Sequence, residues 1–357
     1  VPDVMTEDIT RGTDSGYEWF SNWMGNRYQS EQYVYPQFIW NTMLAGINKA
    51  NATINWLKPY NDNEQCSRYI GMAYTMRAHA YLMAAQMYEF LANDATSPVN
   101  ADGNNVLSLT LPILTESGEA NDSTRVPKAK MVDFIKADLT RAEQLLKGFT
   151  RTNKTQPDLA VVYGLRARLA LWEEEYMAAA EYARLAINQS GATPMTRNQW
   201  LDTQKGFNTL DPSAWMWGLQ YNEEDATVKT GIINWTSWLS GQTTFGYTGY
   251  STYMYTQIDR RLYERIADTD FRKLSWKAPQ GSALDGQNTY VEGSHPEVMP
   301  AYASLKFRPG QGNADDYNIG ACVAVPLMRV EEMMLIEAEA KARTSASEGL
   351  MALNSFV

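Results

Sequence analysis

The 357-residue sequence has little of the residues on which most metal and nucleophilic sites depend. It contains only two cysteines, Cys66 and Cys322, and two histidines, His79 and His295. Two cysteines exclude a disulfide framework and a multi-cysteine zinc site, and whether they pair with each other stays open. The histidines form no HExxH pair and no nucleophile–base set. His79 lies on an apolar stretch, and we interpret it as a structural residue.

Positive charge and long apolar runs are scarce as well. The formal net charge is −10, and no cluster of lysines and arginines could follow a phosphate backbone, which argues against a nucleic-acid partner. No segment approaches the ~20 apolar residues of a membrane span. The chain opens with VPDVMTEDITRG, without a signal segment, and ends with EGLMALNSFV inside an expected helix. We therefore expect it to be truncated at both ends.

Carboxylates are numerous, but none of them forms a recognisable site. The acidic runs WEEEY and YNEEDA contain candidates for a glycosidase pair, yet nothing fixes two carboxylates at the required ~5 to 9.5 Å. The loops NEEDA and GNADDYN could hold calcium, but they lack the spaced ligands and the glycine of an EF-hand. Phosphate-binding and dinucleotide-binding glycine motifs are absent. We expect no catalytic residue, no cofactor and no metal.

Paired helices are the most regular signal that the sequence does contain. Apolar residues recur every three or four positions over residues 36–58 and again over 66–91, with Pro59 and Asn61 between the two stretches. Further helices are expected from about residue 128 to 146, on both sides of a hinge near Glu173–Glu175, and in a closing hairpin after residue 330. Alanines at close spacing give these pairs a tetratricopeptide-like character. Arg77 falls on an apolar stripe, and we interpret it as a snorkelling or carboxylate-paired core residue rather than a catalytic one.

Residues 191–325 follow a different pattern, rich in Gly, Ser, Thr, Asn, Tyr and Trp. Such a long segment with few regular elements is usually functional. The fold class expected is therefore mainly α. Tetratricopeptide-like helix pairs form a scaffold over residues 1–190, an irregular ligand-binding subdomain with short helices and strands covers 191–325, and residues 326–357 return to the scaffold.

Two aromatic clusters are the candidate binding sites. The segment 234–255 places seven aromatic residues among three glycines and eight serines or threonines, and the opening loop is similarly rich in rings. Sugars present a face of C–H groups that stacks on such rings, while their hydroxyls bind polar side chains. The same rings could instead fill the interior or form a protein–protein surface. The candidate ligand-binding residues are Trp19, Asn22, Trp23, Tyr28, Trp235, Trp238, Tyr247 and Tyr250.

Seven segments, in the same order along the chain, resemble motifs of the SusD/RagB family of nutrient-binding outer-membrane lipoproteins. They are DVMTEDITRG, WNTMLAGINKANATI, YTMRAHAYLMAAQMYE, VPKAKMVDFIKADLTRAEQLL, YGLRARLALWEEEYMAAAEYA, DTDFRKLSW and VPLMRVEEMMLIEAEAKAR. The residues that carry the resemblance include Asp3, Met5, Thr6, Trp40, Asn51, Arg77, Tyr81, Asp138, Asp270 and Arg272. The family's lipidated cysteine and its C-terminal ERRxELxxEGxR region are not present in this sequence.

The resemblance implies a non-catalytic lipoprotein on the surface of a Gram-negative outer membrane, held by an N-terminal lipid anchor that this sequence lacks. It implies a helical face that docks on a SusC-like TonB-dependent transporter, and loops that bind a glycan. The alternatives are a RagB-like subunit that captures peptide, and a transporter-interaction subunit that binds no glycan. No family motif fixes the loop residues individually, so the eight site residues rest on composition.

Overall fold

The structure, a computed structural model, describes residues 10–11, 33–92, 97–117 and 124–356. The chain divides into two compact units. The helical unit comprises Ser30–Ala192 and Met328–Val357, and the loop-rich unit comprises Val1–Gln29 and Thr193–Leu327. Within the described ranges, no helix combines the length and the apolar character needed to cross a membrane.

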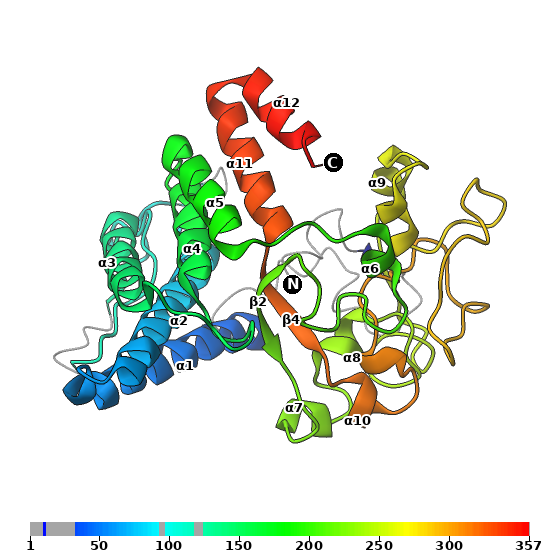
Figure 1. The fold of residues 1–357 in the computed structure, drawn as a ribbon, viewed down its shortest axis with the longest axis horizontal. Helices are drawn as coiled ribbons and strands as arrows, with labels where there is room; N and C mark the ends of the chain where they lie inside the picture. The colour runs from blue at the N-terminus through cyan, green and yellow to red at the C-terminus, as the bar shows by residue number, and fades with distance from the viewer. Residues whose placement is uncertain (1–9, 12–32, 93–96, 118–123, 357) are drawn as a thin grey trace. The chain divides into compact units, whose positions relative to one another are not determined.

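The helical unit consists of paired helices, as the periodicity predicted (Figure 1). Its elements are α1 (Val34–Leu57), the 3₁₀ turn η3 (Lys58–Tyr60), α2 (Glu64–Tyr88), α3 (Lys128–Leu146), α4 (Leu159–Trp172), α5 (Tyr176–Ser190), α11 (Val330–Thr344) and α12 (Ala346–Asn354). Consecutive helices contact each other, and α4 also contacts α2 and α11. The mainly helical fold class is thereby confirmed.

Apolar spacing explains why α1 and α2 form and where their buried faces lie. Ile47, Ala50 and Ile54 of α1 lie one turn apart and are at most 5% exposed. The α2 helix begins after Asn63, whose side chain accepts a hydrogen bond from the Cys66 amide at 3.1 Å. It ends at Tyr88, so Leu91, which the pattern placed on the apolar stripe, lies beyond the helix and is 63% exposed.

The hinge predicted near Glu173–Glu175 is present. The α4 helix ends at Trp172 and α5 begins at Tyr176. Glu174 between them has φ 62°, in the left-handed region that residues with a side chain rarely adopt. This reversal lays α5 against α4.

Arg77 of α2 is fully buried at the centre of a polar network inside the helical unit. Its Nε and Nη2 each donate a hydrogen bond of 2.7 Å to the carboxylate of Asp138 on α3. Its Nη1 donates to Asn51 of α1 and to Glu116, both at 2.6 Å. Burial alone would lower the pKa of Arg77, but the hydrogen bonds and charges of Asp138 and Glu116 raise it. The prediction of a carboxylate-paired core arginine is confirmed.

The closing helix α11 is tied to the earlier helices by ion pairs. Glu337 of α11 has a side chain only 4% exposed and pairs with Arg184 of α5 and with Lys341. Glu332 pairs with Arg168 of α4, with Nε and Oε1 2.5 Å apart. Helices separated by more than a hundred residues of sequence therefore pack together within one unit.

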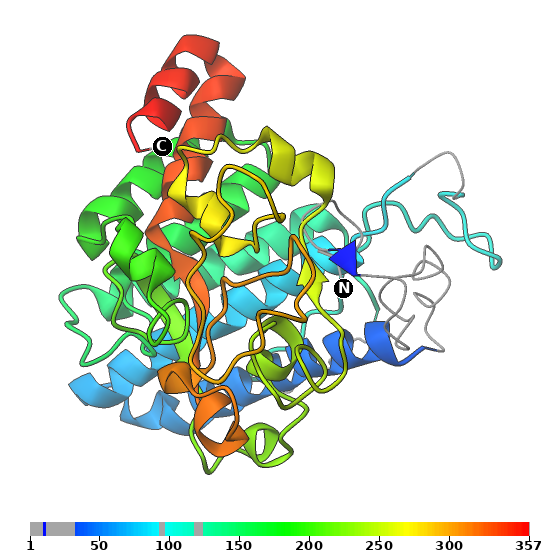
Figure 2. The same ribbon diagram turned by 90° about the vertical axis from the view of Figure 1, so that its right-hand side faces the viewer.

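The loop-rich unit has short elements joined by long loops, which Figure 2 shows in yellow and orange. Its elements are β1 (Thr10–Arg11), α6 (Arg197–Leu201), β2 (Trp215–Gln220), α7 (Ala226–Lys229), α8 (Trp235–Leu239), β3 (Thr256–Gln257), α9 (Arg260–Arg265), the 3₁₀ turns η4 (Phe271–Ser275) and η5 (Gly310–Gly312), α10 (Tyr317–Gly320) and β4 (Ala324–Arg329). Strand β2 pairs with β4, and β1 pairs with β3.

Two features of this unit were not placed by the sequence analysis. The antiparallel pairing of Thr10 with Gln257 and of Arg11 with Thr256 joins residues 10 and 11 to the loop-rich unit, whereas the sequence analysis grouped them with the helical scaffold. Trp215 and Trp217 of β2 are at most 1% exposed and form part of the core. Several tryptophans of this segment therefore stabilise the fold instead of facing a ligand.

Candidate functional site

The structure describes half of the residues predicted to bind ligand. The predicted residues outside the described ranges are Trp19, Asn22, Trp23 and Tyr28. Those inside them are Trp235, Trp238, Tyr247 and Tyr250, which belong to the loop-rich unit.

Short polar side chains fold the loop that follows α8 against that helix. Asn234 caps α8 by accepting a hydrogen bond of 2.9 Å from the Ser237 amide. Thr248 Oγ1 lies 2.8 Å from the Ser237 carbonyl oxygen and 2.7 Å from that of Ser240. Gly249 has φ 92°, and a Cβ there would lie 2.3 Å from the Thr243 carbonyl oxygen. The many serines, threonines and glycines of the segment thus fix the loop, and with it the positions of the rings.

Trp238 and Tyr247 form one ring pair. Their centroids are 4.6 Å apart with an angle of 34° between the planes. The Tyr247 amide donates a hydrogen bond of 2.8 Å to Ser237 Oγ. Both side chains are half-buried, so each ring presents only part of its surface.

Trp235 packs toward the interior of the unit. Its ring meets Phe307 edge-on at 5.5 Å and 87°, and Phe307 in turn contacts Phe207, which is 1% exposed. The Trp235 indole N–H is buried and has no acceptor among the described residues. This packing connects α8 to Phe307 and, through it, to the buried Phe207.

Tyr250 belongs to a group of accessible rings in the loop-rich unit, which we call the ring platform: Tyr250, Tyr253 and His295. Tyr250 is 37% exposed and stacks on His295, with centroids 3.8 Å apart and planes at 22°. Tyr253 is 60% exposed and lies 5.8 Å from Tyr250. His295 Nδ1 is 3.0 Å from Glu297 Oε1. Three neighbouring rings therefore reach the surface of the loop-rich unit.

A small apolar cluster lies in the same part of the loop-rich unit. Tyr255, Met299, Ala303 and Leu305 are buried together and join the two loops that carry the rings. Burial raises the pKa of Tyr255 to about 12, with the charges of Tyr253, Glu297 and Tyr250 adding to the effect. Sequence reasoning did not find His295, because only the fold brings it to Tyr250 and no sequence motif marks it.

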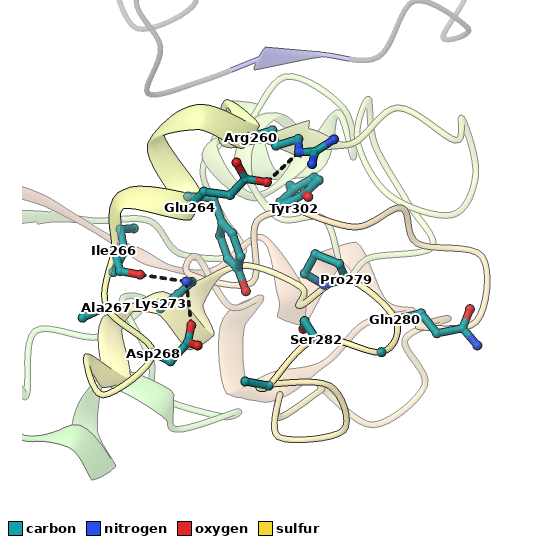
Figure 3. Close-up of a pocket in the computed structure, with 13 residues that line it drawn as sticks. Arg260, Glu264, Ile266, Ala267, Asp268, Lys273, Pro279, Gln280, Ser282 and Tyr302 are labelled. Carbon is teal, nitrogen blue, oxygen red and sulfur yellow. Dashed lines mark hydrogen bonds and ion pairs between the residues drawn. The ribbon is translucent and has the colours of Figure 1, made fainter.

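A pocket of about 570 Å³ lies beside α9, and we call it the α9 pocket (Figure 3). It contains none of the predicted site residues. Its volume falls within the roughly 300–1,000 Å³ of small-molecule sites. Its lining residues are Arg260, Tyr263, Glu264, Ile266, Ala267, Asp268, Lys273, Pro279, Gln280, Gly281, Ser282, Ala283 and Tyr302.

Charged side chains in the α9 pocket are paired with each other. Arg260 Nε lies 2.6 Å from Glu264 Oε1, one turn along α9. Lys273 Nζ donates to Asp268 Oδ1 and to the Ile266 carbonyl oxygen, both at 2.7 Å (Figure 3). The Asp-x-Arg motif lies just before Lys273, where the Asp270 side chain accepts a hydrogen bond from the Arg272 amide and begins η4. This motif positions a wall of the pocket.

Tyrosines form the apolar side of the α9 pocket. Tyr302 contacts Tyr263 edge-on, with centroids 5.1 Å apart. Burial raises the pKa of Tyr263 to about 12, and Asp268 and Tyr302 add to the increase. Tyr302 has φ 69°, held by a hydrogen bond of 2.8 Å from its amide to the Lys277 carbonyl oxygen. Its backbone is thus held in place, and its ring packs against Tyr263.

Ligating side chains do not converge anywhere in the described ranges. No group of three or more His, Cys, Asp or Glu residues there could hold a metal ion. Cys66 and Cys322, whose pairing the sequence left open, are both free thiols.

Comparison with known proteins agrees with this architecture. Residues 3–171 match the SusD-like family model described as "Starch-binding associating with outer membrane". No curated protein matches the chain. Its fold is similar to that of a SusD-like carbohydrate binding protein from Bacteroides vulgatus, with a TM-score of 0.72, 20% identity and coverage of 99% of this chain and 67% of the other.

Two further solved structures show the same fold. A SusD superfamily protein from Bacteroides thetaiotaomicron has a TM-score of 0.62 and 19% identity, over 88% of this chain and 64% of its own. A laminarin-binding SusD-like protein has a TM-score of 0.66 and 16% identity, over 99% of this chain and 77% of its own. This chain thus spans about two thirds of the length of the first two structures. The family model thus covers residues 3–171, and the fold of the chain is that of the SusD-like structures.

Proposed function

We propose that this protein is a non-catalytic, cell-surface glycan-binding subunit of the outer membrane that delivers oligosaccharide to a SusC-like TonB-dependent transporter. The observation that carries the proposal is the ring platform, where Tyr250, Tyr253 and His295 lie together at the surface. Exposed rings supply flat apolar area for the C–H faces of sugars, and the loops around them supply hydroxyl and amide groups. The family description and the laminarin-binding structure support the same class of ligand.

The affinity of the platform for one sugar should be modest. Tyr253 is 60% exposed, so water competes with any ligand for its surface and for the nearby polar groups. Strong retention then requires a polymer that offers many equivalent sugars to the same surface. A polysaccharide is therefore the natural probe.

Affinity electrophoresis in gels containing amylopectin or laminarin tests the proposal. We expect one polymer to retard the intact chain, and Tyr250→Ala or Tyr253→Ala to abolish the retardation while circular dichroism stays unchanged. Tyr60→Ala is the matched control, because Tyr60 is a 61% exposed tyrosine on the helical unit. Retardation unaffected by the platform substitutions would refute the platform, and no retardation by any glycan would favour capture of peptide or a transporter-only role.

Delivery to a transporter needs a separate experiment. The full-length lipoprotein, purified from detergent-solubilised outer membranes, should carry a TonB-dependent barrel in stoichiometric amount. A lone lipoprotein that still binds glycan would retain the capture role and refute the delivery role.

A further inference from the structure

The α9 pocket shares no residue with the ring platform, and its chemistry points to a particular ligand. Its four charged lining residues are two cations and two anions, already paired as Arg260 with Glu264 and Lys273 with Asp268. The two cations and two anions balance, so the lining offers no net positive charge to an anionic ligand. The lining therefore favours a ligand without charge.

The pocket also has an apolar wall at a fixed position. The backbone of Tyr302 is held by two hydrogen bonds, one from its amide to Lys277 and one from the Ile258 amide to its carbonyl oxygen at 3.2 Å. Its left-handed φ of 69° is sustained by these surrounding contacts. Such a ring loses little freedom when a ligand stacks on it. Pro279 also lines the pocket and provides further apolar surface (Figure 3).

The α9 pocket also contains a hydroxyl group, that of Ser282, without a hydrogen-bond partner in the described part of the chain. Ser282 Oγ is buried and has no hydrogen-bond partner among the described residues. Ser282 lines the pocket together with Gln280, whose side chain is exposed. A buried hydroxyl without a partner destabilises the protein until a ligand group satisfies it. Hydroxyl-rich ligands both donate and accept hydrogen bonds, so they match this requirement.

We propose that the α9 pocket is a second carbohydrate subsite that takes a neutral sugar residue, with the Tyr302 ring as its stacking wall and Ser282 Oγ as a hydrogen-bond partner. The proposal rests on the proposed function in that both assign glycan ligands to the loop-rich unit. It adds a selectivity: neutral sugars bind in the pocket and uronic acids are rejected. A short oligosaccharide can occupy the pocket, whereas the open platform retains polymers.

Titration calorimetry and saturation-transfer NMR with cellobiose, maltose, laminaribiose and digalacturonate test this inference. We expect at least one neutral disaccharide to bind and digalacturonate to bind at least tenfold more weakly. Ser282→Ala should weaken the neutral disaccharide about three- to tenfold, the effect of one hydrogen bond, without lowering the melting temperature. Ser347→Ala on α12 is the control serine and should leave binding unchanged.

Tyr302→Ala should abolish disaccharide binding. Because this change also removes the contact with Tyr263, Ser282→Ala, which keeps that contact, makes the test independent of folding. Tyr302→Gly removes the ring without straining the left-handed backbone. The inference is overturned if no disaccharide binds, if Ser282→Ala and both Tyr302 variants bind normally, or if digalacturonate binds as tightly as the neutral sugars. If polymer retention still depends on Tyr250 and Tyr253 in that case, the pocket assignment alone has failed. The loss of both activities would refute the proposed function as well.

Discussion

Arg77 and Asp138 form a bidentate ion pair between α2 and α3, with side chains 0% and 1% exposed. Both guanidinium–carboxylate hydrogen bonds measure 2.7 Å, and Arg77 Nη1 binds two further acceptors. Removing such a pair from water costs free energy. Once both groups are buried, however, each one compensates the charge of the other, and loss of either leaves an unpaired buried charge. The arrangement has a direct consequence for stability.

Asp138→Asn should lower the free energy of unfolding of the helical unit by about 3–5 kcal/mol, because it leaves a buried guanidinium without its main counter-charge. Urea denaturation followed by far-UV circular dichroism measures the loss. Glu64→Ala is the control: Glu64 pairs with Arg68 on the exposed side of α2 and is 83% exposed, so its removal should cost at most about 0.5 kcal/mol. Equal effects of the two substitutions would contradict this reading of the network.

His79 should make the protein less stable as the pH falls. Burial, with a smaller effect of Arg168, lowers the pKa of His79 to about 3 in the folded state, against an unfolded value of about 6.5. Above pH 6.5 both states carry a neutral imidazole and the contribution to stability is complete. Between pH 6.5 and 3 the unfolded state binds a proton that the folded state does not. The free energy of unfolding therefore falls by up to about 1.4 kcal/mol per pH unit.

The comparison that isolates this effect is between the intact chain and His79→Leu. Urea unfolding at pH 7.5, 6.5, 5.5 and 4.5 gives the free energy of unfolding of each. We expect their difference to shrink as the pH is lowered, because only the intact chain loses the histidine contribution. A constant difference across this range would mean that His79 takes up its proton equally in the folded and unfolded states, so that burial does not lower its pKa.

Two helical glycines should respond in opposite ways to alanine. Gly46 in α1 is exposed, and the nearest atom to an added Cβ would be 4.0 Å away. Gly71 in α2 is buried, and a Cβ there would lie 2.9–3.1 Å from atoms of Leu145 and Leu146 in α3. Gly46→Ala should therefore raise the free energy of unfolding by about 0.5–1 kcal/mol through helix propensity. Gly71→Ala should lower it by about 1–3 kcal/mol through overpacking, and thermal unfolding distinguishes the two signs.

Tyr253 should show a conflict between stability and binding. Its φ is 54° although its ring is 60% exposed, so the ring contributes little packing to offset a strained backbone. Tyr253→Gly should leave stability unchanged or raise it by about 1 kcal/mol, while weakening polysaccharide retention as strongly as Tyr253→Ala does. A Tyr253→Gly variant that keeps full retention would show that this ring takes no part in ligand capture.

Sequence periodicity predicted the helical unit well because helix formation and burial there depend on the same spacing. Ile47, Ala50 and Ile54 form the apolar repeat in the sequence, and the same three residues are buried in the core of the structure. Residue type alone could not separate the roles of the aromatic residues in the loop-rich unit. Trp217 is fully buried, Trp235 packs on Phe307 and Tyr253 faces solvent, although all three lie in segments rich in small polar residues.

The parts of the site that the sequence did not predict depend on contacts between distant segments. His295 reaches Tyr250 through the fold of two loops, and the α9 pocket brings residue 302 against residues 260–283. Ser282 becomes notable only because its hydroxyl is buried without a partner. A buried hydroxyl without a partner cannot be predicted from the neighbouring residues in the sequence.

The ion pair between Arg184 of α5 and Glu337 of α11 lies close to where the chain leaves the helical unit and where it returns. The 135 residues from Thr193 to Leu327 are thus an insertion between two helices that contact each other directly. Insertions, deletions and exchanges within that span leave the junction intact. The contact between α5 and α11 does not depend on the length of that span, so the span and the helices that hold its two ends can change independently.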